Sequence, residues 1–179
     1  DQILEMAVIV TDEKLREIVQ ETWLVAPQRY SGAGWDAMPE RVRQMHEASG
    51  LRAELAAAAS LPSIYDVGQM ALDFIRPHVD EKTAPAGGRN VAAFDRQFFR
   101  DRIKFFDDYL HYRSVDVSGI ECVARILRGD AFVEQCYAVN RRLVRALPDC
   151  RTAIAQLRWY RDHFFVADEC DAGYLGRNP

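Results

Sequence analysis

The sequence lacks the patterns that mark zinc sites and disulfide frameworks. It has 179 residues and four cysteines, with no Cys-x-x-Cys pair and no matching histidine spacing for zinc. Cysteines in helical segments usually act as small buried hydrophobic residues, and disulfides are rare inside cells. We therefore expect an intracellular protein from a reducing compartment.

Long apolar runs and a basic excess are also lacking. No run approaches the roughly 20 apolar residues that span a bilayer, so no membrane partner is expected. The net charge of −4 argues against broad binding to duplex nucleic acid, although it permits a short strand held by metal ions and local contacts. The sequence opens at Asp1 without an initiator Met or a signal peptide, so we expect a trimmed or processed form.

The patterns that are present mix strands with helices over a length that suits one domain. We predict one domain over residues 1–166 and an irregular tail over 167–179. Aliphatic runs predict strands at 3–10, 15–25, 91–94 and 112–117, with a turn at 85–88. Helical spacing, prolines in first turns and an N-cap at Ser118 predict helices at 39–47, 51–59, 63–76, 95–103, 118–127, 131–143 and 148–163. This order predicts a layered α/β fold.

One further segment combines charges with aromatic residues. We predict a solvated face for its charged residues, which are Asp101, Arg102, Lys104, Asp107 and Asp108. We predict core or dimer contacts for its aromatic residues, which are Phe98, Phe99, Phe105, Phe106 and Tyr109.

Five groups of residues carry a family likeness. They are Asp1–Ala7 with Val10–Asp12, His46–Leu51, Asn90–Phe99, His111–Arg113 with Asp116–Ser118, and Arg145–Asp149 with Trp159–Phe164. Each group is short, but together they span nearly the whole chain in a fixed order. In that order they resemble oligoribonuclease, the small 3′→5′ exonuclease family that finishes off very short RNAs. The chain looks like a divergent member.

The resemblance implies a ribonuclease H-like exonuclease fold, with a mixed central sheet flanked by helices, and a homodimer. It also implies four acidic residues that hold two Mg²⁺ or Mn²⁺ ions, together with a histidine base. Two-metal phosphodiester hydrolysis needs hard oxygen ligands that hold the ions roughly 3.5–4 Å apart. A histidine base typically contributes about 10²–10⁴-fold to the rate.

Two of the four acids have counterparts here. Asp95 matches the third acid and Asp149 the fourth, which makes them the candidate catalytic and metal-binding residues. Asp95 could instead cap the helix that it begins. For Asp149 we favour the simpler role of an acid that stabilises a helix N-terminus.

The remaining catalytic parts of the family have no match in this sequence. The first two acids belong to an Asp-x-Glu motif on the family's central first strand, which would precede Asp1. Since unpaired backbone groups cost roughly 1–3 kcal/mol each, we expect upstream residues or another chain to supply that strand. The histidine base aligns with Val144, which cannot transfer a proton. His163 lies far along the last helix, and we predict a surface or interface role for it.

The resemblance also implies substrate-binding residues, which are His46, Tyr112, Arg113 and Ser118. Arg113 could hold a phosphate or form a buried or interface ion pair. Tyr112 could reach a partner's active site, but we favour ordinary aromatic packing. Other family contacts are replaced, a tryptophan by Arg41, a serine by Val91 and a threonine by Gly119.

Three hypotheses follow. The first is a catalytically impaired pseudoenzyme that serves as a structural or docking subunit of a larger ribonucleoprotein assembly, for which a mitochondrial location is considered. The second is an active exonuclease for short oligoribonucleotides, using Mg²⁺ or Mn²⁺ and acids upstream of Asp1. The third is a non-catalytic protein that binds RNA ends through His46 and Arg113.

Overall fold

The computed structural model describes residues 3–27, 33–36, 38–139 and 144–165, so the predicted tail at 167–179 lies outside it. The strands are β1 (Glu5–Thr11), β2 (Glu17–Leu24), β3 (Pro85–Gly88) and β4 (His111–Asp116). The helices are α1 (Ala33–Asp36), α2 (Glu40–Ala48), α3 (Leu51–Ala57), α4 (Ile64–Ile75), α5 (Asp95–Arg102), α6 (Lys104–Tyr109), α7 (Val117–Arg128), α8 (Asp130–Val139) and α9 (Ala146–His163). The predicted α/β class is confirmed.

The predicted N-terminal hairpin is present. β1 and β2 pair antiparallel, with Met6 opposite Trp23 and Val10 opposite Val19. In the connecting turn the Asp12 carboxylate accepts hydrogen bonds from the backbone N–H groups of Lys14 and Arg16. Alternation along β1 buries Met6 and Val10, so one face of the hairpin joins the core.

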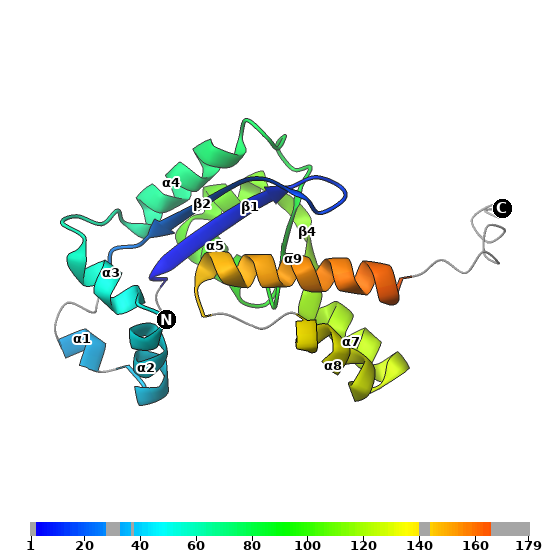
Figure 1. Ribbon diagram of the computed structural model, residues 1–179. Coiled ribbons are helices and arrows are strands. Elements are labelled where there is room, and N and C mark those ends of the chain that lie inside the picture. The colour runs from blue at the N-terminus through cyan, green and yellow to red at the C-terminus, as the bar shows by residue number, and fades with distance from the viewer. Residues whose placement is uncertain (1–2, 28–32, 37, 140–143, 166–179) are drawn as a thin grey trace.

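Helix α4 covers that face, as its apolar spacing predicts. Its N-terminus is fixed by a capping box, in which the Ser63 hydroxyl accepts the Asp66 N–H and the Asp66 carboxylate accepts the Ser63 N–H. In Figure 1 α4 and α9 lie on opposite sides of the hairpin, and both pack against it. The core between the hairpin, α4 and α6 contains Met6, Val10, Trp23, Val25, Val67, Ala71, Leu72, Ile75, Ile103 and Phe106.

The C-terminal helices form a second core. α7 and α8 pack against each other and against α9, which also contacts β3. Their buried residues are Val117, Ala124, Val133, Cys136, Ala153 and Tyr160. Helix α9 therefore joins both cores, because it also packs along β1.

The strands form two sheets of two. Within the described ranges β1 pairs with β2, β3 pairs in parallel with β4, and no ladder joins the two pairs. The missing central strand was expected between the first strand and one at residues 91–94. Residues 91–94 form a turn, so that placement is wrong on one side, and the strand itself stays a prediction. In Figure 1 α9 runs beside β1, and it contacts strands of both sheets.

The strand predicted at residues 91–94 is wrong, and so is the turn predicted at 85–88. The strand is Pro85–Gly88, whose backbone pairs in parallel with β4, and residues 91–94 form a turn. The Asp116 carboxylate accepts the N–H groups of Asn90 and Ala92, which folds this segment away from the sheet. A bond from a residue so distant in sequence is invisible to local patterns.

The N-cap predicted at Ser118 is also wrong. α7 begins one residue earlier, and Asp116 is its N-cap, accepting the N–H groups of Ser118 and Gly119. The Ser118 hydroxyl instead accepts the Asn90 N–H at 3.1 Å. Similarly, α9 starts at Ala146, so Pro148 lies within its first turn rather than at its first position.

The charged and aromatic segment after α5 only partly follows the prediction. Phe99, Phe105, Phe106 and Tyr109 pack in or against the first core, as predicted. The predicted solvated face is wrong for Asp107, which is buried and pairs with buried Arg96. The four other charged residues of the run are exposed.

No disulfide joins Cys122, Cys136 and Cys150, the cysteines that the structure describes, and the reducing compartment stays a prediction. Cys136 is buried and Cys150 half-buried, but Cys122 is exposed, so the buried role predicted for helical cysteines is wrong there. Among the described helices, none has the length and apolar content needed to cross a membrane.

Candidate functional site

Three acidic side chains, from α5, α9 and β4, lie near enough to one another for two of their charges to act on the third. Asp95 begins α5, Asp149 lies in the first turn of α9, and Asp116 ends β4. The charges of Asp149 and Asp116 both act on Asp95. The fold therefore brings the two acids that the resemblance singles out, far apart in sequence, into one corner. We call Asp95 and Asp149 the carboxylate corner.

Asp95 is held in a conformation that disfavours its charge. Burial raises the pKa of its carboxyl to about 6, the nearby charges of Asp149 and Asp116 add to that rise, and its own backbone N–H opposes it. The alternative that Asp95 caps α5 is wrong, because the N-cap position is Phe94. A carboxylate with a raised pKa next to other acids is typical of a functional site.

The thiol of Cys150 lies near the carboxylate corner. Burial, together with the charges of Asp149 and Asp95, raises the pKa of Cys150 to about 12. The thiol therefore stays protonated at neutral pH, and a protonated thiol is a poor metal ligand. Its sulfur lies 3.9 Å from the Ala7 carbonyl oxygen on β1.

The described residues do not by themselves fit the two-ion centre that the resemblance implies. Such a centre needs several carboxylates around both ions. Among the described residues, no three His, Cys, Asp or Glu side chains lie close enough to hold an ion. The carboxylate corner offers two acids and a protonated thiol, so no metal-dependent step is derived for it.

The position matched to the family's base is open to solvent. Val144 lies just before α9, and its side chain is 48% exposed. It precedes Asp149 by five residues, the spacing at which the family carries its base. Its isopropyl group offers no atom that can take a proton.

The next residue, Arg145, fixes the start of α9. Its guanidinium donates to both carboxylate oxygens of Glu5 on β1, with N–O distances of 2.7–3.1 Å, and to both carboxylate oxygens of Glu54 on α3. It also donates to the Ser49 carbonyl, and the Glu5 carboxylate accepts the Ala146 N–H. The side chain of Glu5 is 7% exposed. We call this group the Arg145 clamp, because it ties the helix that carries Asp149 to β1 and α3.

His46 lies near Glu5, a residue of the Arg145 clamp. It is in the last turn of α2, where burial lowers its pKa and the Glu5 carboxylate partly opposes that effect. Its ring centroid lies 6.1 Å from that of Trp35, over whose ring the Arg52 guanidinium sits at 5.2 Å. Nothing in the described geometry brings His46 to Arg113, so the two predicted RNA contacts lie in separate regions.

Tyr112 and Arg113 point outward. Tyr112 is 73% exposed, so the packing role that we favoured is wrong. The Arg113 guanidinium lies 5.2 Å from the centre of the Tyr112 ring, and the His111 ring lies 4.5 Å from it on β4. Arg113 is exposed, so the buried ion pair considered for it is wrong, while an ion pair at an interface stays a prediction. We call Tyr112 and Arg113 the exposed stack, and the half-buried His111 ring lies tilted beside it.

Ser118 has a structural role. Its hydroxyl and the Asp116 carboxylate both accept the N–H of Asn90, in the turn that leads to Asp95. The two side chains hold the approach to the carboxylate corner. His163 is exposed and stacks on Trp159, as predicted for a surface residue.

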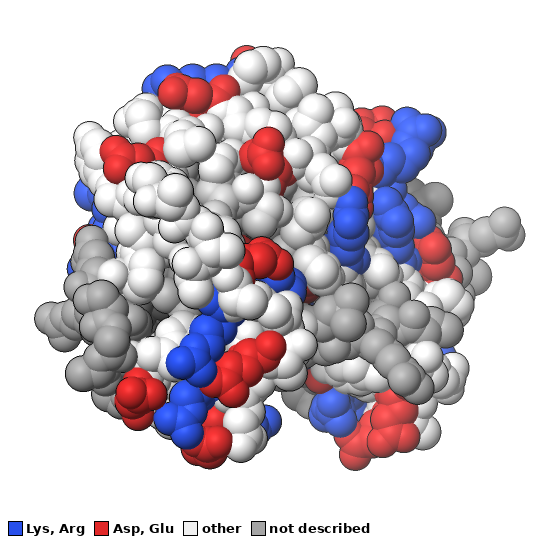
Figure 2. Space-filling model, turned by 60° about the vertical axis from the view of Figure 1, so that its left-hand side comes forward, with Lys and Arg blue, Asp and Glu red and all other residues white. Residues whose placement is uncertain are grey.

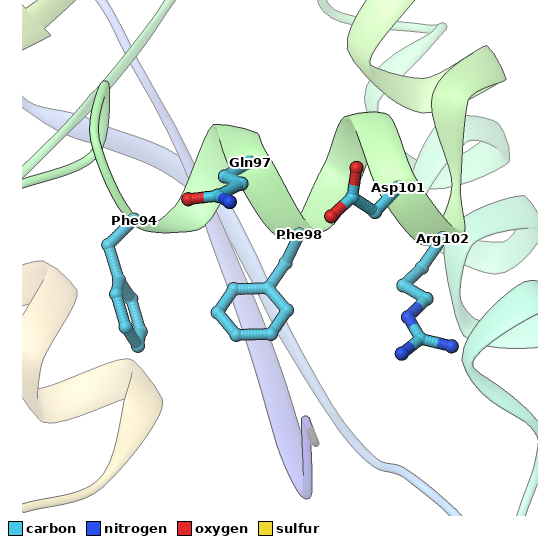
Figure 3. Close-up of a pocket in the computed structure, with 5 residues that line it drawn as sticks. All are labelled: Phe94, Gln97, Phe98, Asp101 and Arg102. Atoms are coloured by element: carbon cyan, nitrogen blue, oxygen red, sulfur yellow. The ribbon is translucent and has the colours of Figure 1, made fainter. Parts of the chain in front are cut away.

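A pocket of about 230 Å³ lies along α5, next to Asp95. It is lined by Phe94, Gln97, Phe98, Asp101 and Arg102. Figure 3 shows the rings of Phe94 and Phe98 projecting from the same side of the helix. Phe98 lines this pocket rather than joining the core residues, and Phe94 is 57% exposed.

The surface charges are mixed in sign. Figure 2 shows Lys and Arg side chains beside Asp and Glu in small groups, and the described part of that face has no broad basic area. This pattern agrees with the net charge of −4. Any contact with RNA would therefore depend on a few local groups rather than on a general field.

Sequence reasoning missed several residues of the site. Arg145 was noted for its likeness to the family, but no local signal pairs it with Glu5, which lies 140 residues away. No prediction was made for buried Trp35, although a large aromatic residue among glycines can indicate a packing anchor. Buried Arg96 was missed because Arg next to Asp normally indicates surface.

Comparison with known proteins agrees with the resemblance. No family model matches the chain. Oligoribonucleases of Streptomyces avermitilis and Streptomyces griseus are each 38% identical over 167 residues, covering 93% of this chain and 80% and 79% of theirs. The oligoribonuclease of Mycobacterium avium is 36% identical over 168 residues, covering 93% of this chain and 75% of its own. With this extent of identity, and a mixed α/β architecture consistent with a ribonuclease H-like exonuclease fold, the chain belongs to the oligoribonuclease family.

Proposed function

We propose that this protein is a catalytically impaired member of the oligoribonuclease family, retained as a structural or docking subunit. The observation that carries the proposal is Val144, a half-exposed apolar side chain at the position of the family's base. A fold that has lost its chemistry persists through its surfaces, and this one keeps a well-ordered scaffold around the corner.

Further support comes from the corner itself. The thiol of Cys150 is protonated by virtue of its raised pKa, and the described residues bring together two acids rather than a full ligand set. Loss of a base alone lowers a rate by about 10²–10⁴-fold. Weak ion binding would lower it further.

The test is hydrolysis of a labelled dinucleotide with Mn²⁺. We expect the same background rate for the wild-type protein and for Asp95→Ala. A wild-type rate that Asp95→Ala abolishes would sink the proposal. Val144→His is the informative companion, because a complete metal site that lacks only its base would gain roughly 10²–10⁴-fold from it.

The second candidate is an active 3′→5′ exoribonuclease. It is favoured by the raised pKa of Asp95 beside Asp149, since a bound cation would relieve that unfavourable charge. It requires two more acids on an added strand between the two sheets. Their lack of direct pairing in the described residues leaves that place compatible with such a strand.

Ion binding separates this candidate from the first. Isothermal titration with Mn²⁺ should give two ions per chain for an active nuclease, both lost in an Asp95→Ala, Asp149→Ala double variant. Absence of saturable binding would leave the impaired protein as the better description.

The third candidate is a protein that binds RNA ends without cutting them. The exposed stack of Tyr112 and Arg113 favours it, because a guanidinium binds phosphate and aromatic faces stack on bases. His46 cannot share this contact, since it lies with Trp35 and Glu5. Salt-dependent binding of a short RNA, weakened by Arg113→Ala, would support this candidate, and no binding at low salt would remove it.

Assembly and compartment remain predictions. The homodimer, a larger ribonucleoprotein partner and a mitochondrial location all derive from the resemblance, and the relatives named above are from bacteria. Sedimentation of the full chain measures the oligomeric state directly.

A further inference from the structure

The residues that form the exposed stack lie in an interruption of the second sheet. Pro85 on β3 is opposite His111 on β4, but the next residue, Ala86, is opposite Ser114. Tyr112 and Arg113 are therefore two extra residues that the partner strand does not match. Bulges of this kind redirect side chains and are common near functional sites.

One buried side chain holds this bulge. The Nη1 group of Arg96 donates to the carbonyl oxygens of His111 at 2.9 Å, Tyr112 at 3.0 Å and Arg113 at 3.2 Å. It also approaches the Ser114 hydroxyl at 3.3 Å. In a regular strand successive carbonyls point to opposite sides, so their convergence on one nitrogen requires the bent backbone of a bulge.

The guanidinium is itself fixed. Its Nε donates to the Asp107 carboxylate at 2.7 Å, and the side chains of Arg96 and Asp107 are 6% and 8% exposed. A charge at this depth is tolerated because it is paired and its Nε and Nη1 groups both donate hydrogen bonds. A lysine would keep the charge but would offer no rigid fork to join a carboxylate to a row of carbonyls.

We infer that Arg96, oriented by Asp107, is the positioning residue that builds the bulge and so presents Tyr112 and Arg113 to a ligand. It follows Asp95 directly on α5, so one short helix sets both the carboxylate corner and the exposed stack. The ligand part of this inference rests on the third candidate function, a short RNA whose phosphate Arg113 contacts.

Limited proteolysis tests the positioning role without RNA. Trypsin cleaves after Arg113 only when the bulge opens, and the carbonyl of that scissile bond is one that Arg96 holds. For Arg96→Lys in the full chain we expect cleavage of the Arg113–Ser114 bond to be at least about tenfold faster, since two or more hydrogen bonds are lost. Cleavage of the Arg128–Gly129 bond, at the end of α7, is the internal control and should change less than about twofold.

Equal acceleration at both bonds, or none at either, overturns the inference. If Arg96→Lys does not fold, Asp107→Asn decides the matter, because it keeps Arg96 and removes the charge that orients it. It should speed cleavage after Arg113 by a smaller factor and leave the control bond unchanged. No selective change in that variant also overturns the inference.

Binding of a 5′-phosphorylated diadenosine to the full chain then tests the ligand part. We expect Arg96→Lys and Arg113→Ala to weaken affinity by similar factors, and the double variant to be no weaker than Arg113→Ala alone. Additive losses would contradict an action of Arg96 through Arg113. If the wild-type protein binds none of this RNA, the third candidate function fails, while the proteolysis result still decides whether Arg96 builds the bulge.

Discussion

The carboxylate corner and the exposed stack are both held by an arginine, yet the two arginines do different work. Arg145 binds two carboxylates, those of Glu5 and Glu54, and thereby fixes a helix against a strand. Arg96 binds one carboxylate and three backbone carbonyls, and thereby shapes a strand. The first arrangement neutralises charge and the second sets backbone geometry.

The carboxylate corner and the exposed stack also differ in their electrostatic environment. At the corner, burial and like charges raise the pKa of Asp95, so the native protein holds a charge that it disfavours. In the stack, Tyr112 and Arg113 are exposed and nothing around them is unfavourable. Stored electrostatic strain at the corner and a relaxed surface at the stack make the corner the costlier region to keep.

The largest effect is expected when the Arg145 clamp is broken. Arg145→Met leaves the Glu5 carboxylate buried and without its cation, which typically costs about 3–5 kcal/mol. Urea unfolding measures the loss. Arg151→Met is the matched control on the same helix, since Arg151 pairs with Glu17 at the surface and should cost less than about 1 kcal/mol. Equal losses of unfolding free energy in the two variants would show that the Arg145–Glu5 ion pair contributes no more than a surface ion pair.

The second effect has the opposite sign. Because the pKa of Asp95 is about 6 in the native protein and lower when unfolded, its ionisation opposes folding as the pH rises from about 4 through 6. Asp95→Asn should therefore stabilise the protein by roughly 1–3 kcal/mol at pH 7–8 in metal-free buffer, and by nothing near pH 3. Thermal unfolding across this pH range provides the test, and a gain that does not depend on pH would refute the electrostatic cause.

A smaller effect separates the two carboxylates of the clamp. Glu54 is 52% exposed and Glu5 only 7%, so water can replace the contacts of Glu54. We expect Glu54→Gln to cost less than about 1 kcal/mol and Glu5→Gln distinctly more, since its oxygens also accept the Ala146 N–H. Paired urea titrations compare them, and a reversed order would mean that burial does not govern this network.

The smallest effect is expected in the exposed stack. Arg113→Ala removes an exposed guanidinium and should change the free energy of unfolding by less than about 0.5 kcal/mol. A larger loss, measured by the same urea titration, would assign the stack a role in folding rather than in recognition.

The sequence predicted the parts of the fold that depend on neighbours in the chain. An aliphatic run marks β1, alternation marks β2, and the spacing from Ile64 to Ile75 with Ser63 before it marks α4. The parallel strand Pro85–Gly88 escaped notice because its pairing with β4 uses backbone groups, and two of its residues are glycines. The turn after it depends on the distant carboxylate of Asp116.

In the candidate site, too, features that depend on residues from distant elements were not predicted. Asp95 and Asp149 were found by likeness to the family, and the fold places them together. The exposure of Tyr112 was not predicted, because it depends on a bulge that Arg96 holds from another element. Asp107 was taken for a surface charge since its partner, Arg96, lies outside its own run of charges.

The most direct test of the central claim is a single-turnover reaction with protein in excess over a labelled dinucleotide and Mn²⁺ present. The account predicts that the wild-type chain releases no more mononucleotide than an Asp95→Ala, Asp149→Ala double variant. Release by the wild type that the double variant lacks would contradict it and identify the protein as a working exonuclease.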